Sequence, residues 1–192
     1  MHMPIDINLL LVRIWMAVFL LWFITAVTSK RTTQSHEKGA SRVAVWIVWI
    51  GWLLLFSHGT KFSWLKQRFV PVNDTAAYVG VGIAIAGLGL AVWARFFIGR
   101  NWSPMIEMKA DHQLIRTGPY ALVRHPIYSG FMLATLGTGI TFGEVSGLVA
   151  FILVLAAWGY KAQLEERVLL QHFGIEYERY RQEVKGLIPF IW

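Results

Sequence analysis

Five long apolar stretches alternate with polar segments along the chain. Residues 7–28, 43–57 and 78–98 are apolar almost throughout, and 127–142 and 145–160 follow as a close pair. A helix needs about 20 predominantly apolar residues to cross the hydrocarbon core of a bilayer. The pattern therefore predicts an all-α integral membrane bundle with about five transmembrane helices.

The last two apolar stretches are separated only by Gly143 and Glu144. So short a connection predicts a helical hairpin whose turn barely leaves the bilayer. A polar helix is expected to continue over residues 161–172 and to end at Gly174. The pattern of residues 176–184 predicts one more short amphipathic helix.

Small residues spaced four apart occupy the third apolar stretch. Their glycines resemble a dinucleotide-binding fingerprint, but no soluble strand precedes them, so the context that this fingerprint needs is absent. Small residues at this spacing let transmembrane helices approach closely. Close helix packing is predicted for three pairs: Gly80/Ala84, Gly82/Ala86 and Gly87/Ala91.

The composition supports the membrane class. The chain is 56% hydrophobic and 15% charged, against about 25% charged residues in soluble proteins. Its 10 Trp, 12 Phe and 6 Tyr suit aromatic belts at the two membrane interfaces. The absence of cysteine excludes disulfides, thiolate metal sites and a cysteine nucleophile. Residues 1–11 lack a basic region and a small-residue cleavage site, so the first apolar stretch is expected to be a permanent span.

The positive charge predicts an orientation. Net charge is +7, and segments 29–42, 94–126 and 161–192 hold most of the 18 lysine and arginine residues. The positive-inside rule then favours an external N-terminus and a cytoplasmic C-terminus. The orientation of the protein in the membrane explains the excess of lysine and arginine, so we expect no nucleic-acid partner. Arg13, within the first span, either snorkels outward or points into a cavity.

The chain divides by chemistry into two regions. Residues 1–93 contain the first three spans, and 94–192 carry two spans and most of the polar residues. The second region carries the polar chemistry, and its two long polar segments are expected to lie together on the cytoplasmic side.

The most informative polar motif is Arg124-His125-Pro126, which follows a Gly-Pro-Tyr turn and precedes Tyr128. Proline fits the first turn of a helix, so Arg124 and His125 would lie just before a helix N-terminus. The free N–H groups and dipole there favour an anion. The alternative is a snorkelling arginine beside an interfacial histidine.

A second motif, Glu165-Glu166, lies beyond the apolar part of the last span. These carboxylates could pair with Arg124 or Arg167, face a cation, or belong to a solvated, salt-bridged helix. Further on, Tyr177 and Tyr180 are three residues apart and share one helix face. Ordinary packing of a tail helix on the membrane surface would also explain this spacing.

The order of these motifs resembles the isoprenylcysteine carboxyl methyltransferase family, and more loosely phospholipid methyltransferases and membrane sterol reductases. The resemblance covers roughly residues 87–191. It rests on Asn101-Trp102-Ser103, His112, Gly-Pro-Tyr, Arg-His-Pro-x-Tyr, a helical hairpin, Glu-Glu, Phe-Gly-x-x-Tyr-x-x-Tyr and Ile-Pro-Phe-Ile.

The resemblance implies an enzyme that uses S-adenosylmethionine, without a Rossmann fold or a metal. Residues 94–192 would be its catalytic region and would form a C-terminal cofactor pocket at the cytosolic face. The enzyme would methylate a lipophilic acceptor that enters from the bilayer. No protein partner is implied. The implied site has two sets of residues: His112, Gln113, Leu114, Tyr120, His125, Tyr128, Glu165 and Glu166 for the cofactor, and Arg124, Glu166 and Arg179 as candidate catalytic residues.

One position departs from the family pattern. Glu183 stands where eukaryotic members have an arginine associated with the carboxylate of the substrate. An isoprenylcysteine-like carboxylate is the expected acceptor, and a lipid amine, thiol or hydroxyl is the alternative. Two other classes stay open: an NADPH-dependent reductase, which would need clustered arginines, and a non-catalytic membrane protein on the same scaffold.

Overall fold

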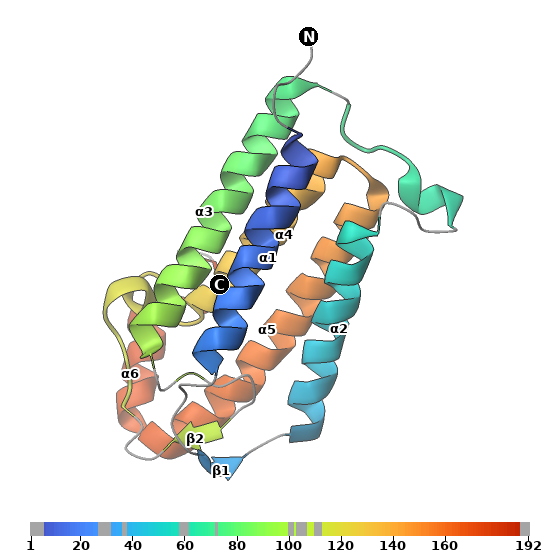
Figure 1. Cartoon of the computed structure of the whole chain (residues 1–192). Coiled ribbons are helices and arrows are strands. Elements are labelled where there is room, and N and C mark those ends of the chain that lie inside the picture. Colours follow the sequence, from blue (N-terminus) through green and yellow to red (C-terminus); the bar gives the residue numbers. More distant parts are fainter. Residues whose placement is uncertain are drawn as a thin grey trace.

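Helices form almost all of the part of the chain that the computed structural model describes (Figure 1). The described residues are 6–26, 32–35, 38–57, 62–71, 73–99, 102, 107–109 and 113–188. The elements are α1 (Ile7–Ala26), β1 (Thr32–Ser35), α2 (Lys38–Phe56), η1 (Ser63–Lys66), α3 (Asp74–Ile98), β2 (Glu107–Lys109), η3 (Gly118–Ala121), α4 (Pro126–Phe142), α5 (Val145–Phe173) and α6 (Ile175–Glu183).

Four helices, α1, α2, α3 and α5, are long and apolar enough to cross a membrane. The fourth predicted span, α4, has 17 residues, which corresponds to about 25 Å at 1.5 Å per residue. Most of its side chains are buried among the other helices. The predicted all-helical bundle is confirmed, with α4 as its short central helix.

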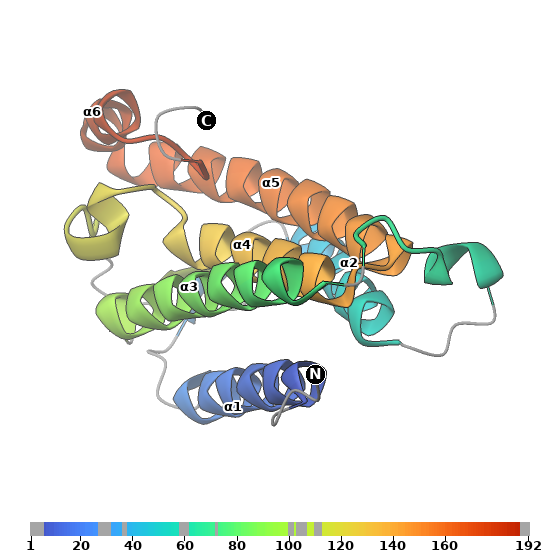
Figure 2. The same ribbon diagram turned by 90° about the horizontal axis from the view of Figure 1, so that it is seen from above.

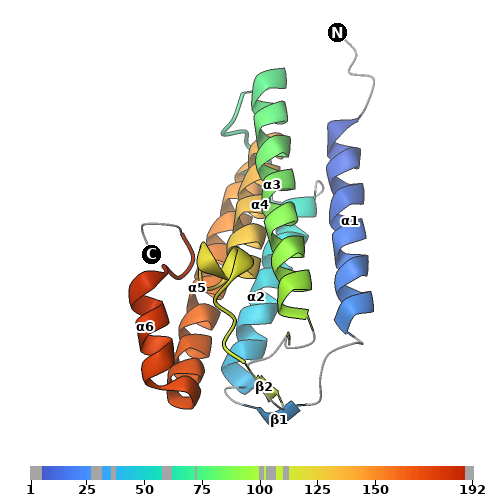
Figure 3. The same cartoon turned by 90° about the vertical axis from the view of Figure 1, so that its left-hand side faces the viewer.

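The hairpin between α4 and α5 forms where the sequence predicts it. Pro126 is the first residue of α4. Gly143 ends α4 in the left-handed region with φ 69°, a conformation that favours glycine. Gly174, with φ 53°, ends α5, and α6 then turns back beside it (Figure 3). The charged second half of α5 is thereby placed next to the start of α4.

The helices α3 and α4 pack along each other at the closest approach in the bundle (Figure 2). Glycines make this possible on both sides, because a Cβ on Gly87 would lie 2.6 Å from the Gly130 oxygen and one on Gly137 would lie 2.5 Å from the Gly80 oxygen. The predicted close packing at Gly80 and Gly87 is confirmed.

The pair Gly82/Ala86 does not take part in packing between the described helices. A Cβ on Gly82 would have no neighbour within 4 Å, and Ala86 is exposed. The prediction for this pair was wrong because spacing alone does not say which face of a helix meets a partner.

A two-stranded antiparallel ladder was not expected from the sequence. β1 pairs with β2, with Thr32 opposite Lys109 and Ser35 opposite Glu107. The ladder ties the segment after α1 to the segment after α3 at the same end of the bundle as α6 (Figure 1).

Aromatic side chains fill the middle of the bundle. The indole N–H groups of Trp15 and Trp52 donate to the hydroxyls of Thr138 and Thr135 at 3.0 and 3.1 Å, respectively. These bonds satisfy polar groups that would otherwise be costly to bury. Helix α1 stands at the side of the bundle (Figure 3) and Arg13 on it is exposed, consistent with the outward alternative.

Candidate active site

The two sequence motifs with the most chemistry meet at the start of α4. The guanidinium of Arg124 contacts Glu166 Oε1 through Nη2 at 2.6 Å and Nε at 2.9 Å. His125 reaches both carboxylates, with Nε2 3.2 Å from Glu166 and Nδ1 3.5 Å from Glu165. The hairpin brings these groups together because α5 runs back past the N-terminus of α4. Of the predicted partners, Arg124 is the one that pairs with the acidic motif.

The environment of His125 favours its charged form. Burial by itself would lower the pKa of the imidazole, but the hydrogen bonds and negative charges of Glu165 and Glu166 outweigh it and raise that pKa. Both ring nitrogens face carboxylate oxygens, as in an imidazolium that donates twice.

A buried lysine completes the cluster and was not among the predicted site residues. Lys161 is 2% exposed and its Nζ lies 3.5 Å from Glu165 Oε1. The hydroxyl of Tyr128 donates to the same oxygen. The Tyr128 ring is stacked between His125 and Trp158, with centroids 5.6 and 4.4 Å away, and Lys161 Nζ lies 5.3 Å from its centroid. The spacing of Lys161 and Glu165, four residues apart, was the available sequence signal.

The segment after α6 holds the start of α4 in place. The amides of Arg124 and His125 donate to the carbonyls of Lys185 and Gly186 at 2.8 and 3.0 Å. The Arg124 side chain also donates to the carbonyl of Val184. The segment that follows the tail helix therefore fixes both the backbone and the side chain of Arg124.

A small cavity lies on one side of this cluster. It has a volume of about 70 Å³ and is bordered by Gln113, Leu114, Tyr120, Arg124 and the tyrosines of α6. The hydroxyl of Tyr177 is buried there, beside the guanidinium of Arg124. Burial raises the pKa of Tyr177 and Tyr120, so both phenols stay neutral hydrogen-bond donors.

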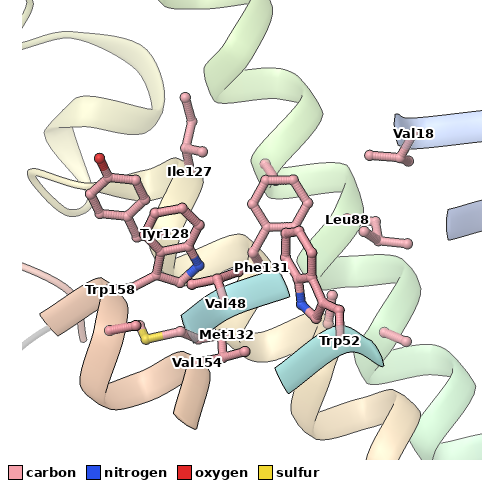
Figure 4. Packing of buried hydrophobic residues seen from close by; sticks show 14 of the residues in the cluster. Val18, Val48, Trp52, Leu88, Ile127, Tyr128, Phe131, Met132, Val154 and Trp158 are labelled. Carbon is pink, nitrogen blue, oxygen red and sulfur yellow. The ribbon is translucent and has the colours of Figure 1, made fainter. Parts of the chain in front are cut away.

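A larger cavity lies on the other side. Its volume is about 460 Å³ and its walls are aromatic and aliphatic side chains of α1, α2, α4 and α5. Tyr128, Trp158 and Lys161 border it at one end, and Figure 4 shows the first two rings side by side. The indole N–H of Trp158 is buried and has no hydrogen-bond partner within the described part of the chain. An apolar cavity with an ammonium and an indole donor at one end suits an amphipathic molecule.

The remaining residues predicted for the site lie apart from the charged cluster or outside the residues that the structure describes. Arg179 is exposed on α6, whereas Arg181, two residues further on, reaches Glu166 at 3.5 Å. Glu183 pairs with Arg116 at 2.7 Å. Some predicted positions lie outside the described residues: His112, Asn101, Ser103 and the last three residues of the Ile-Pro-Phe-Ile motif.

Known proteins are similar to this chain in both sequence and fold. The model of the isoprenylcysteine carboxyl methyltransferase (ICMT) family matches residues 80–171. The protein-S-isoprenylcysteine O-methyltransferase of Schizosaccharomyces pombe is 34% identical over 165 residues, which cover 77% of this chain and 68% of that protein. A probable protein-S-isoprenylcysteine O-methyltransferase of Oryza sativa subsp. indica is 38% identical over 120 residues, 60% of this chain and 62% of that protein.

Among solved structures, the eukaryotic intramembrane Ras methyltransferase ICMT matches with a TM-score of 0.63 and 25% identity, over 98% of this chain and 70% of that one. The chain thus spans about 62% of the length of the rice relative. The apolar helices and this structural match identify an integral membrane protein. On the family model and the S. pombe relative together, the chain belongs to the isoprenylcysteine carboxyl methyltransferase family.

Proposed function

We propose that the protein transfers a methyl group from S-adenosylmethionine to a lipophilic acceptor, namely the carboxylate of an isoprenylcysteine-like molecule. One observation carries the proposal: a single cluster of charged residues lies between a small cavity lined by three tyrosines and Arg124 and a large apolar cavity. Arg124 borders the first cavity and Tyr128 with Lys161 borders the second. Such an arrangement can bring a charged cofactor and an amphipathic acceptor together.

The chemistry of the residues fits S-adenosylmethionine, which carries a carboxylate, an ammonium and an aromatic base. Arg124 and the protonated His125 offer cationic donors, and Glu165 and Glu166 offer carboxylates for an ammonium group. The buried hydroxyl of Tyr177 lies beside the guanidinium of Arg124, and the two groups together can bind a polar group of a ligand. The adjoining cavity of about 70 Å³ is smaller than typical ligand pockets, so it accounts for part of such a ligand.

When bound, the cofactor supplies a methyl group already activated on a sulfonium. The residues then have to orient the acceptor and exclude water rather than form a covalent bond. Orientation alone can contribute roughly 7–11 kcal/mol to lowering a barrier. The ring of Tyr128, stacked between His125 and Trp158, borders the apolar cavity and fixes the geometry of that end of it.

The apolar cavity offers its own anchor for a carboxylate. Lys161 Nζ and the unsatisfied indole N–H of Trp158 both border it, and an ammonium with an N–H donor can hold both oxygens of a carboxylate. Glu183, at the tail position where an arginine was expected, borders neither cavity. Lys161 therefore supplies a positive charge at the apolar cavity in place of the one absent at position 183, and this favours a carboxylate over an amine as the acceptor group.

Binding of radiolabelled S-adenosylmethionine to the detergent-purified protein tests the cofactor assignment. Replacing Glu166 by Gln removes a charge-assisted interaction worth about 1.5–3 kcal/mol, so Kd should rise tenfold or more. Glu176→Gln, on the exposed face of α6, is the matched control and should bind like wild type. Failure of the wild type to bind, or normal binding by folded Glu166→Gln, would overturn the assignment.

A further inference from the structure

The apolar cavity ends on three aromatic rings contributed by three different helices. Phe19 of α1, Trp52 of α2 and Phe131 of α4 all line it. Their rings are in contact, with centroids 5.0 Å apart for Phe19 and Trp52 and 5.2 Å apart for Trp52 and Phe131. We call these three residues the aromatic floor.

The floor lies at the opposite end of the cavity from the charged cluster. Figure 4 shows Trp52 beside Phe131, with Tyr128 and Trp158 on the far side of the labelled group. Along α1 the lining residues run from Phe19 to Ala26, a helical rise of about 10 Å. An acceptor whose head group is held at Lys161 would therefore extend its chain toward the floor.

The floor is fixed in position and backed by further aromatic packing. The Trp52 indole donates to Thr135 at 3.1 Å, and the residue is 6% exposed. Behind it the ring of Trp15, 5.4 Å away, is held in turn by Thr138 at 3.0 Å. Two consecutive layers of hydrogen-bonded indoles cannot move aside easily, because buried donors would lose their acceptors.

We infer that the aromatic floor sets the maximum length of the acceptor's hydrocarbon chain, with Trp52 as the residue that determines specificity. This inference rests on the proposed function, in which the apolar cavity holds the chain of the acceptor. A hydrocarbon chain that just reaches the aromatic floor fits the cavity. Each additional carbon of a longer chain must displace a packed ring or fold back toward the end of the cavity at Lys161. Apolar pockets discriminate about tenfold or more for a single misplaced methylene.

The test compares cysteine derivatives that carry S-geranyl, S-farnesyl and S-geranylgeranyl groups as acceptors. Trp52→Ala opens space below the floor, so the ratio of kcat/KM for the longest to the shortest chain should rise about tenfold. Phe19→Ala should shift the ratio in the same direction from another helix. Trp46→Ala and Leu20→Ala, exposed at 68% and 60% on α2 and α1, are the matched controls and should keep the wild-type ratio.

Trp52→Leu and Trp52→Phe serve as milder variants in case the alanine variant unfolds. Binding of the same cysteine derivatives to protein in nanodiscs is measured alongside the rates. If the wild type binds the chains but methylates none, the proposed function fails, while the length dependence of binding still tests the floor. Folded Trp52 and Phe19 variants that preserve the wild-type length preference in binding would overturn the inference.

Discussion

The contact between α3 and α4 makes a sharp prediction about stability. Replacing Gly87 by Ala adds a single methyl group, whose carbon would lie 2.5 Å from the Ala134 nitrogen and 2.6 Å from the Gly130 oxygen. Both neighbours are backbone atoms of α4, so a change of side-chain rotamer cannot relieve the overlap. Gly82→Ala, on the same helix, has no neighbour within 4 Å and is the matched control.

The expected magnitude follows from these distances. To bring the new methyl to the 3.4 Å of ordinary contact, the two backbones must separate by about 1 Å, and a densely packed interior resists such a shift. Overpacking of this kind typically costs about 1–3 kcal/mol. The better helix propensity of alanine offsets up to about 1 kcal/mol at either position. Gly87→Ala should therefore be destabilising, and Gly82→Ala neutral or slightly stabilising.

Unfolding of the purified variants in mixed micelles, by titration with a denaturing detergent, measures the difference. The account predicts a clearly lower midpoint for Gly87→Ala than for Gly82→Ala. Equal midpoints would show that α3 and α4 do not pack through their glycines, and the arrangement of the bundle would then be wrong.

Three further predictions concern the site and the orientation. Because the pKa of His125 is raised, the charged imidazole stabilises the fold fully below its ordinary pKa of about 6.5, and this stabilisation is lost as pH rises through the raised pKa. The Tm of the wild type should therefore fall more between pH 6 and pH 9 than the Tm of His125→Gln. Parallel curves of Tm against pH would contradict the pairing of His125 with both carboxylates. Lys161→Met should raise KM for a carboxylate acceptor about tenfold or more with S-adenosylmethionine binding retained, whereas an unchanged KM would exclude Lys161 as the anchor. A reporter fused to the C-terminus should be active in the cytoplasm, and activity on the outer side alone would reverse the orientation.

Much of the site could be predicted from the sequence because its motifs flank a short hairpin. Pro126 and Gly143 mark the ends of α4, which has 17 residues. An antiparallel partner of 29 residues must carry its polar second half past the start of α4. That reasoning places Glu165 and Glu166 near Arg124 without any knowledge of packing angles. The pairing observed at 2.6 Å confirms it.

Other features depend on the rotation of each helix and on contacts between distant segments. Arg95 and Lys161 lie in two of the basic segments that predict the orientation, yet both are 2% exposed. Arg95 donates to the carbonyls of Thr25 and Gly99 at 2.7 and 2.9 Å and stacks on Trp102. A charged residue near the end of an apolar stretch can snorkel or turn inward, and the pattern of the stretch itself does not distinguish the two.

Methyl transfer to a lipophilic carboxylate can be measured in a single assay. Wild-type protein in detergent is incubated with methyl-labelled S-adenosylmethionine and an S-farnesylcysteine derivative, and the lipid product is treated with base. The account predicts label in the lipid that base releases, as expected of a methyl ester, with a rate that falls strongly in Glu166→Gln and is unchanged in Glu176→Gln. Absence of label in the lipid, or label that withstands base because it sits on another atom, would contradict it.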